Sequence, residues 1–255
     1  LGPTHPDTLK AMMSLSVSYS SAGRHDEALK LRLETVELMR KTLGPDHPHT
    51  LIGLNNLASC YEQLGQHEEA LKLREETLRL RKAKLGPDHP EIILSMGNVA
   101  FSLVTLHRDD EAVNTIDDCI QRSAGKTVDP RVVPWLMDLR LRVFQKKNDA
   151  AGCRDTARRW ENLNRTDAEN LYTAACMRAV TDAVIRAGDK SQDAARQADA
   201  ESDQAMIWLK QALAAGYDKF DHMRKDKDLD ALRERDDFER LLATHPTTRQ
   251  EIKGP

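Results

Sequence analysis

The chain has 255 residues, a formal net charge of −3 at pH 7, 40% hydrophobic residues and only 4% aromatic residues. The nearly balanced charge provides no electrostatic attraction to nucleic acid or to anionic membranes, and few aromatic rings are present on which bases would stack. The sequence has no apolar run of about 18 residues and no signal-peptide pattern at its start, so we expect a cytoplasmic protein without a nucleic-acid or membrane partner.

A hexapeptide recurs at a fixed interval in the first half of the chain. Residues 43–48 read Leu-Gly-Pro-Asp-His-Pro, residues 85–90 repeat them unchanged, and residues 1–6 differ only at Thr4. The starts at 1, 43 and 85 define a period of 42 residues. Self-similarity of this kind is typical of solenoids, in which each unit buries its apolar face by stacking on its neighbours. The period therefore favours a binding surface over an active site.

Each repeat contains two segments with helical periodicity. In the second repeat, apolar residues between Leu54 and Leu64 follow the helical period of about 3.6 residues, and a second amphipathic segment begins after Gly65. The neighbouring repeats carry the same two segments. We therefore expect each unit to be a pair of antiparallel helices joined by a short turn.

The hexapeptide contains residues that end one helix and begin the next. Gly44 falls where a helix needs a left-handed backbone conformation, and Pro45 prevents the helix from continuing. Pro48 suits the first turn of the following helix, and His47 avoids helical dihedrals because it precedes a proline. We expect helix boundaries here and at the copy over residues 85–90.

Alanines recur at the same interval within the helical segments. Ala28, Ala70 and Ala112 lie in the second segments, and Ala58 and Ala100 lie in the first segments. Because small residues let two helices approach closely, we expect these alanines where the two helices of a pair cross.

The second half lacks the hexapeptide but retains helical patterns. Residues 131–163 are predicted to form a degenerate fourth helix pair, and a further helix is predicted over 167–187. Residues 189–203 are rich in Ala, Asp and Gln, so we expect a mobile insertion before an amphipathic helix over 205–214. The predicted organisation comprises three regular helix pairs over 1–125, degenerate pairs over 126–216, a short helical cap over 217–243 and a disordered tail over 244–255.

The repeat resembles the tetratricopeptide repeat, in the 42-residue form of kinesin light chains. The matching positions are Leu15, Ser16, Tyr19, Gly23 and Ala28, then Leu57, Ala58, Tyr61, Gly65, Ala70 and Thr77. The third repeat departs from the family pattern, with Leu103 in place of the tyrosine and His107 in place of the glycine. The resemblance covers residues 1–125 and implies an all-α fold, an α-solenoid in which antiparallel helix pairs form a right-handed superhelix.

A second, looser resemblance covers residues 130–243. Short stretches look like the C-terminal region of large bacterial serine/threonine protein kinases, at residues 129–131, 150–154, 171–176, 214–217 and 228–233. The chain begins at Leu1 in mid-repeat, without a methionine. We therefore expect a fragment of a larger bacterial protein, and the resemblance suggests a kinase domain upstream.

Two short motifs imitate nucleotide-handling sites. Residues 107–114 match the catalytic-loop pattern of protein kinases, but in repeat register they correspond to the turn and helix start at 65–72. Residues 125–127 imitate the end of a phosphate-binding loop, but the pattern needs a glycine where Ile120 stands. Because their companion motifs are missing from the sequence, we expect no catalytic residues in this fragment.

Metal and redox chemistry are not predicted either. His5, His47 and His89 recur one repeat apart, so stacking separates them instead of gathering them around an ion. The cysteines are widely spaced within helical patterns, which is typical of reduced core residues, and they are Cys60, Cys119, Cys153 and Cys176. We expect no metal and no cofactor.

By resemblance to the family, the first helix of each pair lines a concave face. The positions directed into that face are Met13, Val17 and Ser20, then Asn55, Ser59, Glu62 and Gln63, then Gly97, Phe101 and Val104. Asn55 can donate to and accept from the backbone of an extended peptide, and Phe101 can anchor an apolar side chain. The alternative is that several of these residues only contact solvent or the next helix.

The sequence therefore predicts a non-enzymatic module for protein–protein interaction. We expect it to bind a peptide or partner protein on the concave face and to be a monomer or weak homodimer. The alternative is a regulatory or self-association segment of a bacterial serine/threonine protein kinase, acting through the convex side or the ends of the stack.

Overall fold

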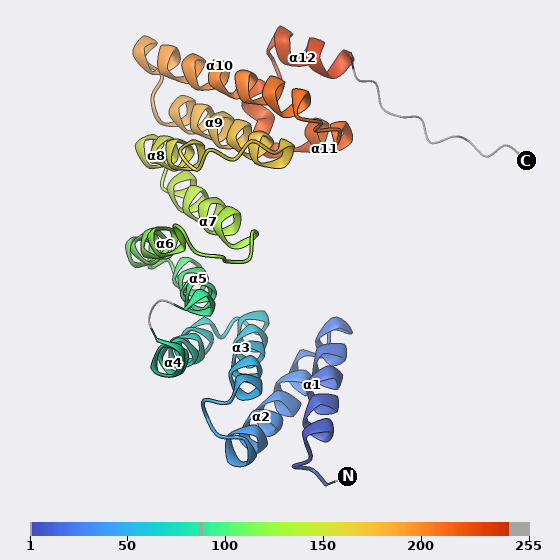
Figure 1. Ribbon diagram of the computed structural model, residues 1–255. Helices are drawn as coiled ribbons and strands as arrows, with labels where there is room; N and C mark the ends of the chain where they lie inside the picture. Colours follow the sequence, from blue (N-terminus) through green and yellow to red (C-terminus); the bar gives the residue numbers. More distant parts are fainter. Residues whose placement is uncertain (1, 87–88, 245–255) are drawn as a thin grey trace, which may run out of the picture. The chain divides into compact units, whose positions relative to one another are not determined.

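The fold is helical throughout the part of the chain that the computed structural model describes, residues 2–86 and 89–244 (Figure 1). No strand occurs in these two ranges. The chain divides into two compact units, residues 1–139 and residues 140–255. Each unit has its own packing and is described separately.

Unit 1 consists of successive helix hairpins (Figure 1). Its helices are α1 (Pro6–Ser21), α2 (His25–Thr42), α3 (Pro48–Gln63), α4 (His67–Leu85), α5 (Pro90–Thr105) and α6 (Asp109–Ser123), followed by the first part of α7 (Val132–Lys146). From α1 to α6, each helix packs against the next one along the chain. Since α1, α3 and α5 begin at 6, 48 and 90, the helices repeat with the 42-residue period of the sequence.

The hexapeptides form the boundaries predicted for them. His47 is the N-cap of α3, with extended backbone, and its Nδ1 atom accepts a hydrogen bond from the backbone N–H of His49 at 3.2 Å. His5 and His89 cap α1 and α5 in the same way. Gly44 has a φ of +98°, a conformation that residues with a side chain rarely adopt. The boundary prediction is confirmed at His47 and His89, and His5 forms the same cap without having been predicted to.

The repeated alanines are fully buried in the helix pairs of unit 1. Ala28, Ala58, Ala70, Ala100 and Ala112 all have 0% of their surface exposed. In this close packing, a larger side chain at any of these positions would displace the neighbouring helix. The predicted helix pairing is confirmed by the packing of α1 on α2, α3 on α4 and α5 on α6, and the burial of all five alanines agrees with it.

Unit 2 begins within α7 and contains longer helices. Its elements are α8 (Ala150–Glu161), α9 (Ala168–Gly188), α10 (Gln192–Ala214), α11 (Phe220–Lys225), the 3₁₀ helix η1 (Lys227–Leu232) and α12 (Asp236–Ala243). The hairpin of α9 and α10 has the most extensive packing, and the short C-terminal helices close one core with it (Figure 1). Tyr172, Leu209, Leu229 and Phe238 meet in that core.

The structure differs from the sequence-based expectation at residues 189–203. We expected a mobile insertion, but residues 192–203 are the first half of α10, and Ser191 caps the helix by accepting from the backbone N–H of Ala194. Ala194 and Ala198 are buried against Ile185 of α9. The polar composition is misleading because two alanines one helical turn apart are sufficient for close contact with a neighbouring helix. Of the predicted tail over 244–255, only Thr244 is described, as the C-cap of α12, and the rest lies outside the described residues.

Candidate functional site

A groove lies between the first helices of the first two repeats, α1 and α3. Its volume is about 410 Å³, and its lining residues are Lys10, Met13, Ser14, Val17, Met39, His49, Ile52 and Asn56. Val17 and Ile52 face solvent with 47% and 48% of their surface exposed, values that are high for aliphatic side chains. The predicted site residues Met13 and Val17 are thus brought together with Ile52, which the sequence analysis did not select.

Polar residues of the predicted site connect neighbouring repeats. The hydroxyl of Ser20 on α1 donates to Oε1 of Gln63 on α3 at 3.3 Å. The amide of Asn98 on α5 donates to Oδ1 of Asn55 on α3 at 3.1 Å. Ser59 donates to the carbonyl oxygen of Asn55 one turn earlier in α3. Because Asn55 uses only its side-chain oxygen in this contact, its amide N–H groups are left to donate elsewhere.

Glu62 is paired inside the protein with Arg74 of α4. The guanidinium donates from Nη1 to Oε1 at 3.0 Å and from Nη2 to Oε2 at 2.7 Å. Nη1 also donates to the hydroxyl of Ser102 and to the carbonyl oxygen of Asn98, both on α5. Arg74 has only 6% of its surface exposed, so this bidentate ion pair lies largely out of water. Glu62 therefore neutralises a buried charge, a role that the sequence analysis did not predict.

The third-repeat residues of the predicted site are used in packing. Gly97 is buried, and a Cβ atom at this position would lie 2.5 Å from Cζ3 of Trp135 on α7. Phe101 and Val104 are half-buried and pack against the core of α5, α6 and α7. The Arg74 guanidinium lies 5.4 Å from the ring centroid of Phe101. Gly97 therefore allows the indole ring to approach α5, and it presents no surface to a ligand.

The arginines Arg32 and Arg74 are buried residues that the sequence analysis did not select. They occupy equivalent positions in α2 and α4, one period apart in sequence number, within otherwise uncharged buried faces. Arg32 donates to the Ser16 hydroxyl at 3.2 Å and to the Asn56 carbonyl oxygen at 2.9 Å. The signal that would have found them was the recurrence of a charged residue among buried positions of the repeat.

The motifs that imitate nucleotide sites are parts of the repeat scaffold. His107 lies in the turn between α5 and α6 with a φ of +60°, and Arg108 is the N-cap of α6. Asp109 is the first residue of α6, so the segment that matches a kinase loop is a turn followed by a helix. Gly125 follows the C-cap of α6 and has a φ of +71°. Neither segment adjoins a strand within the described ranges.

The cysteines are all buried and have no disulfide partner. Burial is the main cause that raises the pKa of Cys119 and Cys153 to about 12, so their thiols are protonated at neutral pH and poorly nucleophilic. The described residues contain no group of three or more His, Cys, Asp or Glu side chains able to hold a metal ion. In the same part of the chain, no helix has the length and apolar character that a membrane crossing needs.

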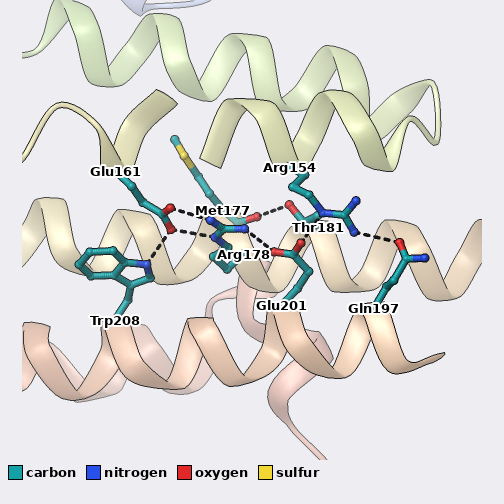
Figure 2. A network of polar contacts seen from close by, with 8 residues as sticks. All are labelled: Arg154, Glu161, Met177, Arg178, Thr181, Gln197, Glu201 and Trp208. Carbon is teal, nitrogen blue, oxygen red and sulfur yellow. Dashed lines mark hydrogen bonds and ion pairs between the residues drawn. The ribbon is translucent and has the colours of Figure 1, made fainter. Parts of the chain in front are cut away.

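Unit 2 contains a buried ionic network between α8, α9 and α10 (Figure 2). Arg178 of α9 donates from Nε and Nη2 to the two oxygens of Glu161 at 2.8 and 2.6 Å, and from Nη1 to Glu201 at 2.7 Å. Trp208 donates its indole N–H to Glu161, and Arg154 donates to the second oxygen of Glu201. Burial alone would lower the pKa of Arg178, but the two carboxylates outweigh it and raise the pKa. The network is internally neutralised and holds three helices together.

Comparison with known families gives a match over the repeats. The family profile described as the tetratricopeptide repeat matches residues 7–83 and 51–123. Residues 7–123 are tetratricopeptide repeats. The matched region includes α1 to α6 almost completely, and the fold is that of an all-α solenoid. This confirms the family and the fold class expected from the sequence.

Solved structures of tetratricopeptide repeat proteins share the fold. The TPR-like repeats described as a putative kinesin light chain of Podosopora anserina are 19% identical, with a TM-score of 0.58 over 88% of this chain and 99% of that one. A single-residue variant of the same protein is 20% identical, with a TM-score of 0.59 over 86% of this chain and 98% of that one. BtubC (BKLC) from P. vanneervenii is 17% identical, with a TM-score of 0.55, over 61% of this chain and 63% of that one.

These similarities establish the fold of the tetratricopeptide chain and leave its partner open. No curated protein matches the sequence. The first two of these structures are described as repeats of a putative kinesin light chain, and none of the three bears on the resemblance of the second half to bacterial protein kinases. That resemblance, with the bacterial origin it implies, stays a prediction.

Proposed function

We propose that the groove between α1 and α3 binds a segment of a partner protein. Tetratricopeptide repeats are in general modules for protein–protein interaction. The observation that carries the proposal is the pair of exposed aliphatic side chains, Val17 and Ile52, which face a groove of about 410 Å³ from opposite helices. An apolar side chain of the partner would cover both and remove their surface from water.

Polar groups near the groove support an extended peptide as the ligand. Asn56 lines the groove, and Asn55 beside it keeps its amide N–H groups for an acceptor such as a peptide carbonyl oxygen. A peptide bound in this way would gain its affinity from the aliphatic contact and its orientation from the asparagine side chains. Phe101, which the sequence predicted as an anchor, is half-buried against the core of unit 1 and contributes less.

The test uses the whole chain and linear peptides selected from a random displayed library. We expect Val17→Ser combined with Ile52→Ser to weaken the selected peptides at least tenfold, because the aliphatic contact is lost. Leu33→Ser is the matched control, since Leu33 is a similarly exposed aliphatic residue on α2 that does not line this groove. Isothermal titration gives the affinities and circular dichroism checks helicity. Equal loss in the control, or full binding by the double variant, would reject the groove as the site.

A further inference from the structure

Two equivalent arginines in unit 1 have different partners. Arg32 and Arg74 are both nine-tenths buried or more, with 5% and 6% of their surfaces exposed. Each donates to the carbonyl oxygen of an asparagine on the following first helix, Asn56 for Arg32 and Asn98 for Arg74. The two guanidinium groups therefore occupy the same place in successive repeats.

Only the second arginine has a carboxylate. Arg74 is held by both oxygens of Glu62, whereas Arg32 donates only to the Ser16 hydroxyl and the Asn56 carbonyl oxygen. Among the described residues, none offers a carboxylate to Arg32. The cause is visible in the sequence, because the residue one period before Glu62 is Ser20.

The Arg32 guanidinium is largely buried without a counter-charge, and its Nη2 group has no acceptor among the described residues but is not enclosed away from solvent. In the next repeat, Glu62 supplies a fork of two oxygens that matches the planar guanidinium. In the first repeat, the shorter Ser20, whose hydroxyl donates to Gln63, brings no carboxylate to the equivalent position. A carboxylate brought by a ligand would satisfy the same geometry.

The neighbouring groove has a charge that favours such a ligand. Asn56, whose carbonyl oxygen binds Arg32, also lines the groove between α1 and α3. Lys10 and His49 line it as well, and none of its described lining residues is acidic. The described lining of this groove is therefore basic or neutral, so an acidic segment meets no like charge within it.

We propose that Arg32 binds the side-chain carboxylate of an Asp or Glu in the partner segment, at the place that Glu62 fills in the second repeat. This proposal rests on the groove's proposed function and specifies the chemistry of its ligand. Arg32 binds the acidic residue, while Val17 and Ile52 contact an apolar residue of the same peptide. At this arginine position, the second repeat thus carries a complete ion pair, and the pair of the first repeat is completed by the partner.

The first experiment tests the arginine without a ligand. Ser20→Glu in the full chain gives the first repeat the glutamate that the second repeat has at Glu62. Because this glutamate can pair with Arg32, we expect a higher urea concentration at the unfolding midpoint than for Ser21→Glu. Ser21 is the matched control because it is the exposed neighbour on α1 and receives the same charge. The difference between the two variants should disappear when Arg32→Met is added to both. Equal midpoints of Ser20→Glu and Ser21→Glu in the otherwise unchanged chain would overturn the proposal.

The second experiment tests the ligand. Linear peptides from the random displayed library, resynthesised with amidated C-termini, should carry an Asp or Glu at a constant distance from an apolar residue. Changing that residue to its amide should weaken binding at least tenfold, and Ser20→Glu should abolish binding while Ser21→Glu retains it. If the amide peptides bind equally well while Val17→Ser with Ile52→Ser still abolishes binding, the Arg32 assignment fails and the groove stands. A phosphoserine peptide that binds more tightly than the acidic one would also overturn the assignment, in favour of a phosphate site.

Discussion

The two units of the chain differ in how their buried arginines are paired with carboxylates. In unit 2, Arg178 meets two carboxylates, Glu161 and Glu201, and both are held by further donors (Figure 2). In unit 1, Arg74 meets one carboxylate, and Arg32 meets none among the described residues. In a unit without internal repeats, the partner of each buried charge can evolve independently. In the first two repeats of unit 1, the arginine recurs with the 42-residue period. A single substitution, serine in place of glutamate, therefore leaves the first arginine without a carboxylate partner within the described part of the chain.

The largest effect is expected from opening the closed network of unit 2. Arg178→Met retains the length of the side chain but leaves Glu161 and Glu201 buried without their common partner. We expect unfolding free energy to fall by about 3–5 kcal/mol, the usual cost of removing one member of a buried ion pair. Urea denaturation followed by circular dichroism measures it. Arg196→Met is the control, because Arg196 lies on α10 with most of its side chain in water. A loss no greater than in the control would mean that the network does not stabilise unit 2.

The next effect concerns the regular packing of unit 1. Ala70→Leu inserts a large side chain where α4 crosses its partner helix, and we expect a loss of about 1–3 kcal/mol in unfolding free energy from overpacking. Ala83→Leu makes the same change at an exposed position of α4 and should leave the stability nearly unchanged. Thermal and urea unfolding of the two variants distinguish them. Equal stability would contradict the close helix crossing inferred from the buried alanines.

The smallest effect is a pH dependence within unit 2. Burial raises the pKa of Asp182, although Ser202 and Arg186 hydrogen-bond to it. A raised folded-state pKa means that the stability from this group is fully present below the unfolded pKa and is lost as pH rises through the folded value. Relative to Asp182→Asn, the wild-type chain should therefore become less stable as pH increases from about 3.8, the unfolded value. Urea midpoints at several pH values measure the difference.

Asp189→Asn provides a control of opposite sign for that pH profile. The backbone N–H of Ser191 donates to Asp189 and lowers the pKa of this exposed carboxyl group. Its stabilising contribution is present above the unfolded pKa and is lost as pH falls through the folded one. The two difference profiles should therefore slope in opposite directions. Parallel profiles would show that the burial of Asp182 has no effect on its titration.

Local signals predicted most of the fold. The hexapeptide places Pro48 and His47 at a helix start, and the alanines at 42-residue spacing predict where the hairpins cross, because backbone sterics and side-chain size act within a few residues. The start of α10 was not predicted, because its apolar contacts come from alanines such as Ala198. A segment rich in alanine and polar residues has the same composition whether it packs against a helix or lies in solvent.

The site was less predictable, because its roles are set by contacts across helices. Gly97 was expected to face a ligand, but Trp135 of α7 covers it, and no short-range pattern connects these two residues. Glu62 was expected on the same face, but its partner Arg74 comes from the next helix and satisfies it internally. Met13 and Val17 do line a groove, and whether they bind a partner stays a prediction.

The hexapeptide junctions have a consequence for how such a chain can change in length. Each junction contains the residues that end one helix and begin the next, and 43–48 and 85–90 are identical in sequence. Removing or duplicating residues 43–84 as one block would therefore join the same junction to the same helix ends. Evolution or protein engineering can shorten or extend the array in whole steps of 42 residues, without designing a new connection each time.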